Sequence, residues 1–405
     1  MILNAQSVNP PFLSQAPEIN NLDSGSTVDN TAVTLAAPRI LNFQGSSGLW
    51  GQYTARIENG LGFARELRIQ NASDIAGPSD PTGFYIAVWS DDPHSDRWHK
   101  LAYDDVVDNQ IRFLDKLPSR GSVAVARVPW YTVTRVYRQT RNTLSKKFVS
   151  TTPSAPTGIH NTQVSPSDWK GRSVPDLPLP AFMIHEGGTS NKNVVVLTAG
   201  NHPYEAQADY NLEGSVNFIL SDDPVAQNLR EWCVFYVYPT INPAGRFAGY
   251  SRSNPELKNA GEDDFNRVWG TSGSHDVIDK MKSAFQSDFN SECDVLIDYH
   301  SFFFNESTTL RGIWAPDEVQ NSGFMANYGL REPDSFNNRL VGSTSNVQTL
   351  PEFAIASMGA SVAVHSEETA STSRNVVEYR RSGKALMEGL WDTIVDGLLS
   401  HGPNN

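Results

Sequence analysis

The sequence predicts an α/β domain with a mixed, mostly parallel sheet flanked by helices, preceded by an all-β antiparallel sandwich. Between residues 38 and 150, short runs alternate apolar with polar residues and are separated by Gly, Pro, Asp and Asn, which is typical of half-buried antiparallel strands. After residue 151, continuous apolar runs alternate with segments of helical periodicity, which indicates strands buried on both faces beneath helices. Pro-rich text around 151–160 marks the predicted domain boundary.

The elements follow this division in chain order. Residues 1–37 are rich in Asn, Ser, Thr and Pro, and predict an irregular N-terminal extension. The 38–150 domain should contain strands in the runs "LWGQYTARI", "ARELRIQNA", "GFYIAVWS", "QIRFLDKL" and "SVAVARVPWYTVTRVYRQ". The 151–405 domain should contain strands in "AFMIHEG", "NVVVLTAG", "CVFYVYPTI", "DVLIDYHS" and "ASVAVHSE". Its helices are expected in "YEAQADYNLEGSVNFIL", "DVIDKMKSAFQSDF" and "VVEYRRSGKALMEGLWDTIVDGLL".

Charge and composition exclude several classes of partner. The 405 residues carry 32 Lys and Arg against 45 Asp and Glu, and the net charge of −13 argues against nucleic acid and anionic membrane surfaces. No long apolar segment or basic leader is present, so we expect a cytoplasmic protein without a membrane anchor. Cys233 and Cys293 lie in or beside apolar runs and are predicted to be buried free thiols. The oligomeric state is not indicated.

Three predicted strands end in side chains that can do chemistry. "TAGNHPYE" supplies His202 and Glu205, "LIDYHS" supplies His300, and "SVAVHSEE" supplies Glu367 and Glu368. In sheets of this kind, ligands bind beyond the carboxyl ends of the strands. Two histidines and one glutamate are sufficient for a catalytic zinc, which leaves its fourth position to water, and a nearby carboxylate can act as base. The alternative is that His202 caps a helix and His300 is a hydrogen-bonded core residue.

The segment 238–269 resembles zinc metallocarboxypeptidases. That family carries, in order, N-P-D-G, an arginine and D-x-N-R, which match Asn242-Pro243-x-Gly245, Arg252 and Asp264-x-Asn266-Arg267. The family's H-x-x-E matches His202 and Glu205, and its later histidine matches His300. An N-terminal sandwich that closes with "VARVPWYTVTRVYRQT" is similar to the bacterial type of the cytosolic-carboxypeptidase branch.

The resemblance implies a role for each matched residue. His202, Glu205 and His300 would bind Zn²⁺. Arg252 would face the developing oxyanion, where a fixed cation is most effective. Asn266 and Arg267 would hold the terminal carboxylate of the substrate, to which a guanidinium donates two parallel hydrogen bonds.

The resemblance implies a general base at the end of the last predicted strand. Alternation puts His365 and Glu367 on one face and Glu368 on the other. If the valines of this strand pack into the core, Glu367 points to the cleft and is the general base; Glu368 remains the alternative. In the family, the residue two places before the base helps to choose the terminal side chain. That residue is His365, predicted to bind substrate and to favour an acidic terminal residue. The tyrosine with which the family covers its substrate has no counterpart between Tyr328 and Tyr379.

These observations predict a zinc metallocarboxypeptidase. It would hydrolyse the C-terminal bond of a peptide or protein with a zinc-activated water and a glutamate base. One alternative is an N-acyl amino acid deacylase of the aspartoacylase kind. The other is a non-catalytic binding protein built on a degenerate carboxypeptidase domain.

Overall fold

The structure is a computed structural model. It describes residues 12–13, 26–29, 31–36, 54–58, 64–70, 87–92, 94–119, 122–126, 129–155, 159–160, 177–203, 205–248, 264–270, 276–303, 312–331, 349–370 and 375–403.

In the described residues, the N-terminal part consists of two five-stranded sheets. One has the order β1-β4-β10-β6-β7 and the other β2-β3-β5-β9-β8. The strands are β1 (Phe12–Leu13), β2 (Thr27–Val28), β3 (Ala32–Ala36), β4 (Thr54–Glu58), β5 (Glu66–Gln70), β6 (Ala87–Ser90), β7 (His99–Leu101), β8 (Tyr103–Val107), β9 (Gln110–Phe113) and β10 (Ser122–Ala126). Alternate apolar residues from both sheets, among them Leu35, Ile57, Leu67 and Val125, form a single core.

Two details of this region differ from the prediction. β3 pairs with β5 in parallel, so the pairing is not antiparallel throughout. β1, β2 and β3 also lie in the segment expected to be irregular. In "AVTLA" of β3 the buried Val33 and Leu35 alternate with Thr34, and this short period-2 pattern was obscured by its polar surroundings.

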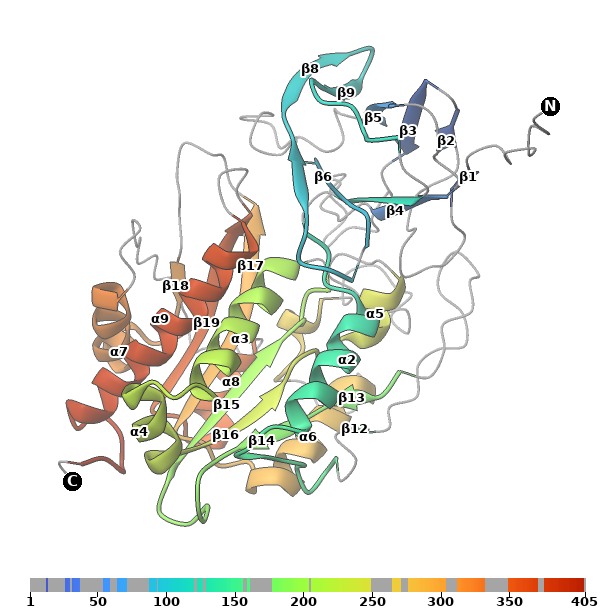
Figure 1. The fold of residues 1–405 in the computed structure, drawn as a ribbon. Coiled ribbons are helices and arrows are strands. Elements are labelled where there is room, and N and C mark those ends of the chain that lie inside the picture. Colours follow the sequence, from blue (N-terminus) through green and yellow to red (C-terminus); the bar gives the residue numbers. More distant parts are fainter. Residues whose placement is uncertain are drawn as a thin grey trace.

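The C-terminal part is built on a seven-stranded sheet of order β11-β14-β16-β15-β17-β19-β18 (Figure 1). Its strands are β11 (Val149–Ser150), β14 (Phe182–Ile184), β15 (Asn193–Ala199), β16 (Cys233–Tyr238), β17 (Val295–Phe303), β18 (Gly312–Trp314) and β19 (Val362–Ala370), while β12 (Ile159–His160) and β13 (Leu179–Pro180) form a separate pair. The four central strands β16, β15, β17 and β19 are parallel, and the three outer pairings are antiparallel. The sheet is therefore mixed, and "mostly parallel" holds only for its centre.

Helices cover both faces of this sheet. They are α2 (Val133–Leu144), α3 (Ala206–Ile219), α4 (Pro224–Trp232), α5 (Pro243–Ala248), α6 (Asp276–Phe289), α7 (Glu318–Arg331), α8 (Leu350–Met358) and α9 (Val376–Val395), with a 3₁₀ turn η4 (Phe265–Arg267). α3 and α9 lie side by side on one face, as Figure 1 shows, and share a core with α7. α6 and α8 contribute to the core of the opposite face.

The three predicted helices are confirmed, but "TVTRVYRQ" was wrongly predicted to be a strand. It forms α2, because Thr132 accepts a hydrogen bond from the Arg135 backbone N–H and caps the helix. Buried Val133, Val136, Thr140 and Thr143 then recur at helical spacing. α2 and β11 precede the predicted boundary, yet β11 belongs to the C-terminal sheet.

One further expectation is met. Cys233 and Cys293 are free and buried. Among the described helices, none combines the length and the apolar character needed to cross a bilayer.

Candidate metal centre

Two adjacent parallel strands bring the predicted ligands together. β15 ends at Ala199, whose partner in β17 is Tyr299, so His202 and His300 follow at the same edge of the sheet. Gly200 makes the turn with φ of 68°, and a Cβ at this position would lie 2.6 Å from Thr240 Oγ1. Glu205 is the residue before the first turn of α3. The chain therefore turns immediately after the buried strand β15, and this turn brings the Glu205 carboxylate back to the end of the strand.

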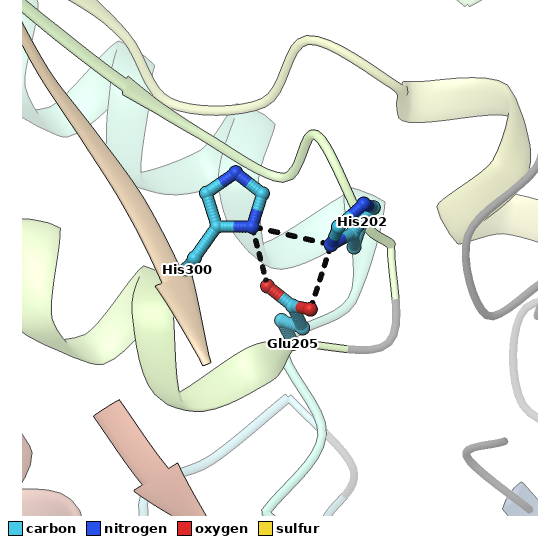
Figure 2. A group of neighbouring side chains, drawn as sticks. All are labelled: His202, Glu205 and His300. Carbon is cyan, nitrogen blue, oxygen red and sulfur yellow. Dashed lines mark hydrogen bonds and ion pairs between the residues drawn. The ribbon is translucent and has the colours of Figure 1, made fainter. Parts of the chain in front are cut away.

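The three side chains converge on one point (Figure 2). His202 Nδ1 lies 2.7 Å from Glu205 Oε1, His300 Nδ1 lies 3.0 Å from Glu205 Oε2, and the two Nδ1 atoms are 3.1 Å apart. All three residues are buried, with exposed fractions of 2%, 3% and 1%. Ligand atoms around a tetrahedral zinc are separated by about 3.3 Å, because each metal–ligand bond is about 2.0 Å long. The residues present therefore fit a zinc ion.

Two aspartates hold the outer nitrogens of these histidines. His202 Nε2 lies 2.8 Å from Asp264 Oδ1, and His300 Nε2 lies 2.8 Å from Asp298 Oδ2. A carboxylate at Nε2 keeps the proton on that nitrogen and leaves the lone pair of Nδ1 pointing at the common centre. This carboxylate–histidine arrangement is typical of metal sites.

Neither aspartate was predicted to have a role from the sequence. Asp264 stands in the D-x-N-R motif, and Asp298 stands two residues before His300. Because residues i and i+2 of a strand share a face, the spacing of Asp298 was a usable signal. The contact of Asp264 with His202 had no such signal, since it spans 62 residues.

The buried charges of the centre compensate one another. Burial alone would raise the pKa of Glu205, but the neighbouring His202 and His300 outweigh it and hold that pKa below its usual value. Burial alone would lower the pKa of His300, but Asp298 and Glu205 raise it well above the usual value. The pKa of Asp298 is lowered, because its pairing with His300 outweighs burial. Without a metal, the centre therefore holds a proton where a cation would bind.

The register of β19 places the two candidate bases on opposite faces. Val362 and Val364 pack in the core shared with α3 and α9, as the strand-face argument required. Glu368, on their face, accepts a hydrogen bond of 2.9 Å from Asn211 of α3. Glu367 is the strand partner of His300, and alternation puts it on the same face as His300.

His365 lies deeper on that face. It is buried, and its ring centroid is 4.4 Å from that of His300 and 4.9 Å from that of the partly exposed Trp314. Its Nδ1 lies 3.3 Å from Asp298 Oδ2. Burial, together with the charge of His300, lowers the pKa of His365 to about 4. Because His365 and Glu368 face opposite sides of the sheet, the second H-x-x-E in the sequence does not form a site.

The remaining predicted residues are placed in part. Asn266 and Arg267 lie in η4, which Asp264 caps by accepting from the Asn266 backbone N–H at 2.8 Å. Asn266 Oδ1 accepts from Asn201 Nδ2 at 3.4 Å, next to the predicted ligand His202, and Arg267 Nη1 donates to the Asn266 backbone oxygen at 2.7 Å. Arg252 lies outside the described residues. Tyr328 is buried in the apolar core of α7 and α9 and does not face the centre.

Comparison with known proteins agrees with this geometry. A family model described as "Zinc carboxypeptidase" matches residues 162–296, which include His202, Glu205 and Asp264. The chain contains a zinc carboxypeptidase domain. The metal of this family is Zn²⁺, and its members are hydrolases that act on peptide bonds.

The curated relatives of this zinc carboxypeptidase domain belong to the cytosolic branch. Human "Cytosolic carboxypeptidase 4" is 39% identical over 80 residues, which is 20% of this chain and 7% of the relative. "Cytosolic carboxypeptidase 6" of Caenorhabditis elegans is 30% identical over 146 residues, 31% of each chain. The matches thus span less than a third of these relatives.

Solved structures match over almost the whole chain. A metallo-carboxypeptidase from Burkholderia cenocepacia has a TM-score of 0.73 at 17% identity, covering 96% of this chain and 99% of its own. A metallo-carboxypeptidase from Pseudomonas aeruginosa, in complex with (2-guanidinoethylmercapto)succinic acid, has a TM-score of 0.70 at 18% identity, covering 96% and 100%. The fold, N-terminal sheets included, is that of bacterial metallo-carboxypeptidases.

Proposed function

We propose that this chain is a zinc-dependent metallocarboxypeptidase that hydrolyses the C-terminal bond of peptides or proteins. The observation that carries the proposal is the convergence of His202 Nδ1, His300 Nδ1 and Glu205 on one point, with both outer nitrogens held by aspartates. These three side chains would hold a zinc ion, which would supply a water of low pKa and polarise the scissile carbonyl.

The other residues follow from the proposed chemistry. Glu367 lies beside His300 across two paired strands, where it takes the proton of the attacking water and gives it to the leaving amine. Arg252 faces the developing oxyanion, and Asn266 with Arg267 binds the terminal carboxylate of the substrate. The buried centre excludes bulk water and so strengthens these charge interactions.

His365 is proposed to bind substrate as a neutral group. With a pKa of about 4, its imidazole carries no charge at neutral pH. An uncharged imidazole gives no electrostatic preference for an acidic terminal residue. A neutral imidazole beside the indole of Trp314 is better suited to an uncharged terminal side chain.

A peptide panel tests the proposal against its alternatives. Purified, zinc-loaded protein is incubated with peptides that differ only in their last residue and with N-acyl amino acids, and products are followed by mass spectrometry. Loss of single residues from the C-terminus is the expected result. Cleavage of N-acyl amino acids alone would indicate the deacylase, and no cleavage of either by zinc-loaded protein would favour the binding protein. The curated relatives are named as cytosolic, which supports the same location here.

A further inference from the structure

Four charged side chains from four segments form a closed ring where the N-terminal sheets meet the C-terminal domain. Asp96 lies between β6 and β7, Arg135 in α2, Glu213 in α3 and Arg380 in α9. Each carboxylate binds both arginines through different oxygens. Asp96 Oδ1 pairs with Arg135 and Oδ2 with Arg380 at 2.6 Å; Glu213 Oε2 pairs with Arg135 at 3.1 Å and Oε1 with Arg380 at 2.9 Å.

The ring is buried on its Arg135 side, whereas Asp96 is exposed, with 43% of its side chain accessible. Arg135 is 4% exposed, and its guanidinium lies 4.5 Å from the ring centroid of Tyr131 and 4.8 Å from that of Tyr210. Its Nη1 donates to the Ser95 backbone oxygen at 3.2 Å and to the Tyr210 hydroxyl at 3.3 Å. A planar guanidinium can satisfy all these partners at once, and its charge interactions are stronger here than in water.

An apolar cluster also lies between the N-terminal sheets and the C-terminal domain. Val88 of β6 and Ala126 of β10 share a buried cluster with Ala206 and Tyr210 of α3, and Trp98 packs against it. The N-terminal part therefore rests on the first two turns of α3.

The proposed metal ligand Glu205 lies immediately before those turns. Glu205 is the N-cap residue of α3, and its side chain makes no capping hydrogen bond to the helix: its oxygens face His202 and His300, and Oε2 also accepts from the Ser301 backbone N–H at 2.8 Å. A helix start is commonly fixed by the side chain of its N-cap. Here other contacts fix it. Ser301 Oγ donates to Gln207 at 3.1 Å, and Arg246 Nη2 donates to Asp209 at 2.9 Å. Tyr210 and Glu213, five and eight residues after Glu205, add the contacts with the N-terminal part.

We propose that Asp96, a residue of the N-terminal part, positions the metal ligand Glu205 by closing this ring on α3. The N-terminal part is then a component of the metal site's scaffold rather than a separate recognition module. Asp96 is a positioning residue, since it acts through Arg135 and Glu213 and touches neither metal nor substrate. The inference rests on the proposed zinc centre.

The test compares zinc release from three full-length proteins: wild type, Asp96→Asn and Asp392→Asn. Asp392 makes an equally direct pair with Arg331, at 2.6 Å, but joins α7 to α9 instead of contacting α3. Release into excess chelator is timed far below the unfolding temperature. Asp96→Asn should release zinc about 2- to 30-fold faster, the range expected for coupling between sites, and Asp392→Asn should not. Asp96→Glu, which keeps the carboxylate, should release zinc about as slowly as wild type.

Two further measurements separate positioning from stability. Hydrogen exchange of the amides of residues 206–210 in the metal-free protein should rise in Asp96→Asn while exchange in α7 stays unchanged. Adding Arg380→Gln to Asp96→Asn should increase zinc release by less than Arg380→Gln does alone, since the ring is already open. Unchanged zinc release and unchanged α3 exchange in Asp96→Asn would overturn the inference and leave the zinc centre intact. A wild-type chain that takes up no zinc would overturn both.

Discussion

Replacing Asp298 by Asn tests whether the carboxylates behind the histidines prepare the metal site. Asp298 is fully buried; its Oδ2 faces His300 Nε2 at 2.8 Å, and its Oδ1 accepts from Thr198 Oγ1 at 2.7 Å. Asn has the same size and can still present an oxygen to His300, because the Thr198 hydroxyl can turn to accept from the new amide. The substitution therefore removes the charge and leaves the packing in place.

The loss of that charge should lower zinc affinity about 100-fold. Removing a partner behind a ligand histidine typically costs 10- to 100-fold in metal affinity, or about 1.4 to 2.7 kcal/mol. Asp298 should lie at the upper end for two reasons. Asp298 is buried, so bulk water cannot compensate for the lost charge. Asp298 Oδ2 also lies 3.3 Å from His365 Nδ1.

The assay is a chelator competition at pH 7 with metal-free protein, and Asp392→Asn serves as the control. Asp392 loses an exposed partner, Arg331, and exposed pairs contribute little, so this variant should bind zinc as wild type does. Wild-type zinc affinity in a folded Asp298→Asn protein would refute the reasoning. It would mean that His300 keeps its orientation and tautomer without the carboxylate.

The remaining predictions concern the base, the proton balance and the turn. Glu367→Gln should keep zinc and lower kcat by about 10²- to 10⁴-fold, whereas Glu368→Gln should change kcat much less; the reverse result in a steady-state peptidase assay would contradict the strand-face assignment. Because the pKa of His300 is raised well above 6.5 in the metal-free protein, zinc must displace its proton. Zinc affinity should therefore rise with pH through neutrality, with about one proton released per zinc, and calorimetry in buffers of different ionisation enthalpy would show a buffer-independent enthalpy if this is wrong. Gly200→Ala should lower the free energy of unfolding by roughly 1–3 kcal/mol, because φ is 68° and Thr240 Oγ1 lies 2.6 Å from the added carbon; denaturant melts equal to wild type would count against this.

The predicted C-terminal elements match the structure because their signals are local. The apolar run of β15 and the helical periodicities of α6 and α9 each lie within one short segment, and they determine the conformation of that segment. α2 was missed because its alternating valines and threonines fit a strand as well as a helix, and the Thr132 cap, a local signal, was outweighed by the neighbouring strand patterns. The parallel β3–β5 pair was missed for another reason, since strand partners are chosen by tertiary packing.

In the candidate site, too, local patterns could be predicted and long-range contacts could not. His202, Glu205 and His300 could be named because each follows a recognisable strand, and parallel strands end at one edge of a sheet. The contact of Asp264 with His202 and the Asp96 ring join residues far apart in the chain, and no short-range pattern predicts them. The roles of Glu367, Asn266, Arg267, His365 and Arg252 remain predictions.

The zinc content of the purified protein tests the central claim most directly. Wild-type protein, washed free of loosely bound ions at neutral pH, should contain about one zinc per chain by elemental analysis, and His300→Ala should contain almost none while keeping its fold. Wild-type protein without zinc after incubation with the metal, or a folded His300→Ala protein with the full amount, would contradict the assignment of His202, Glu205 and His300 as the metal centre.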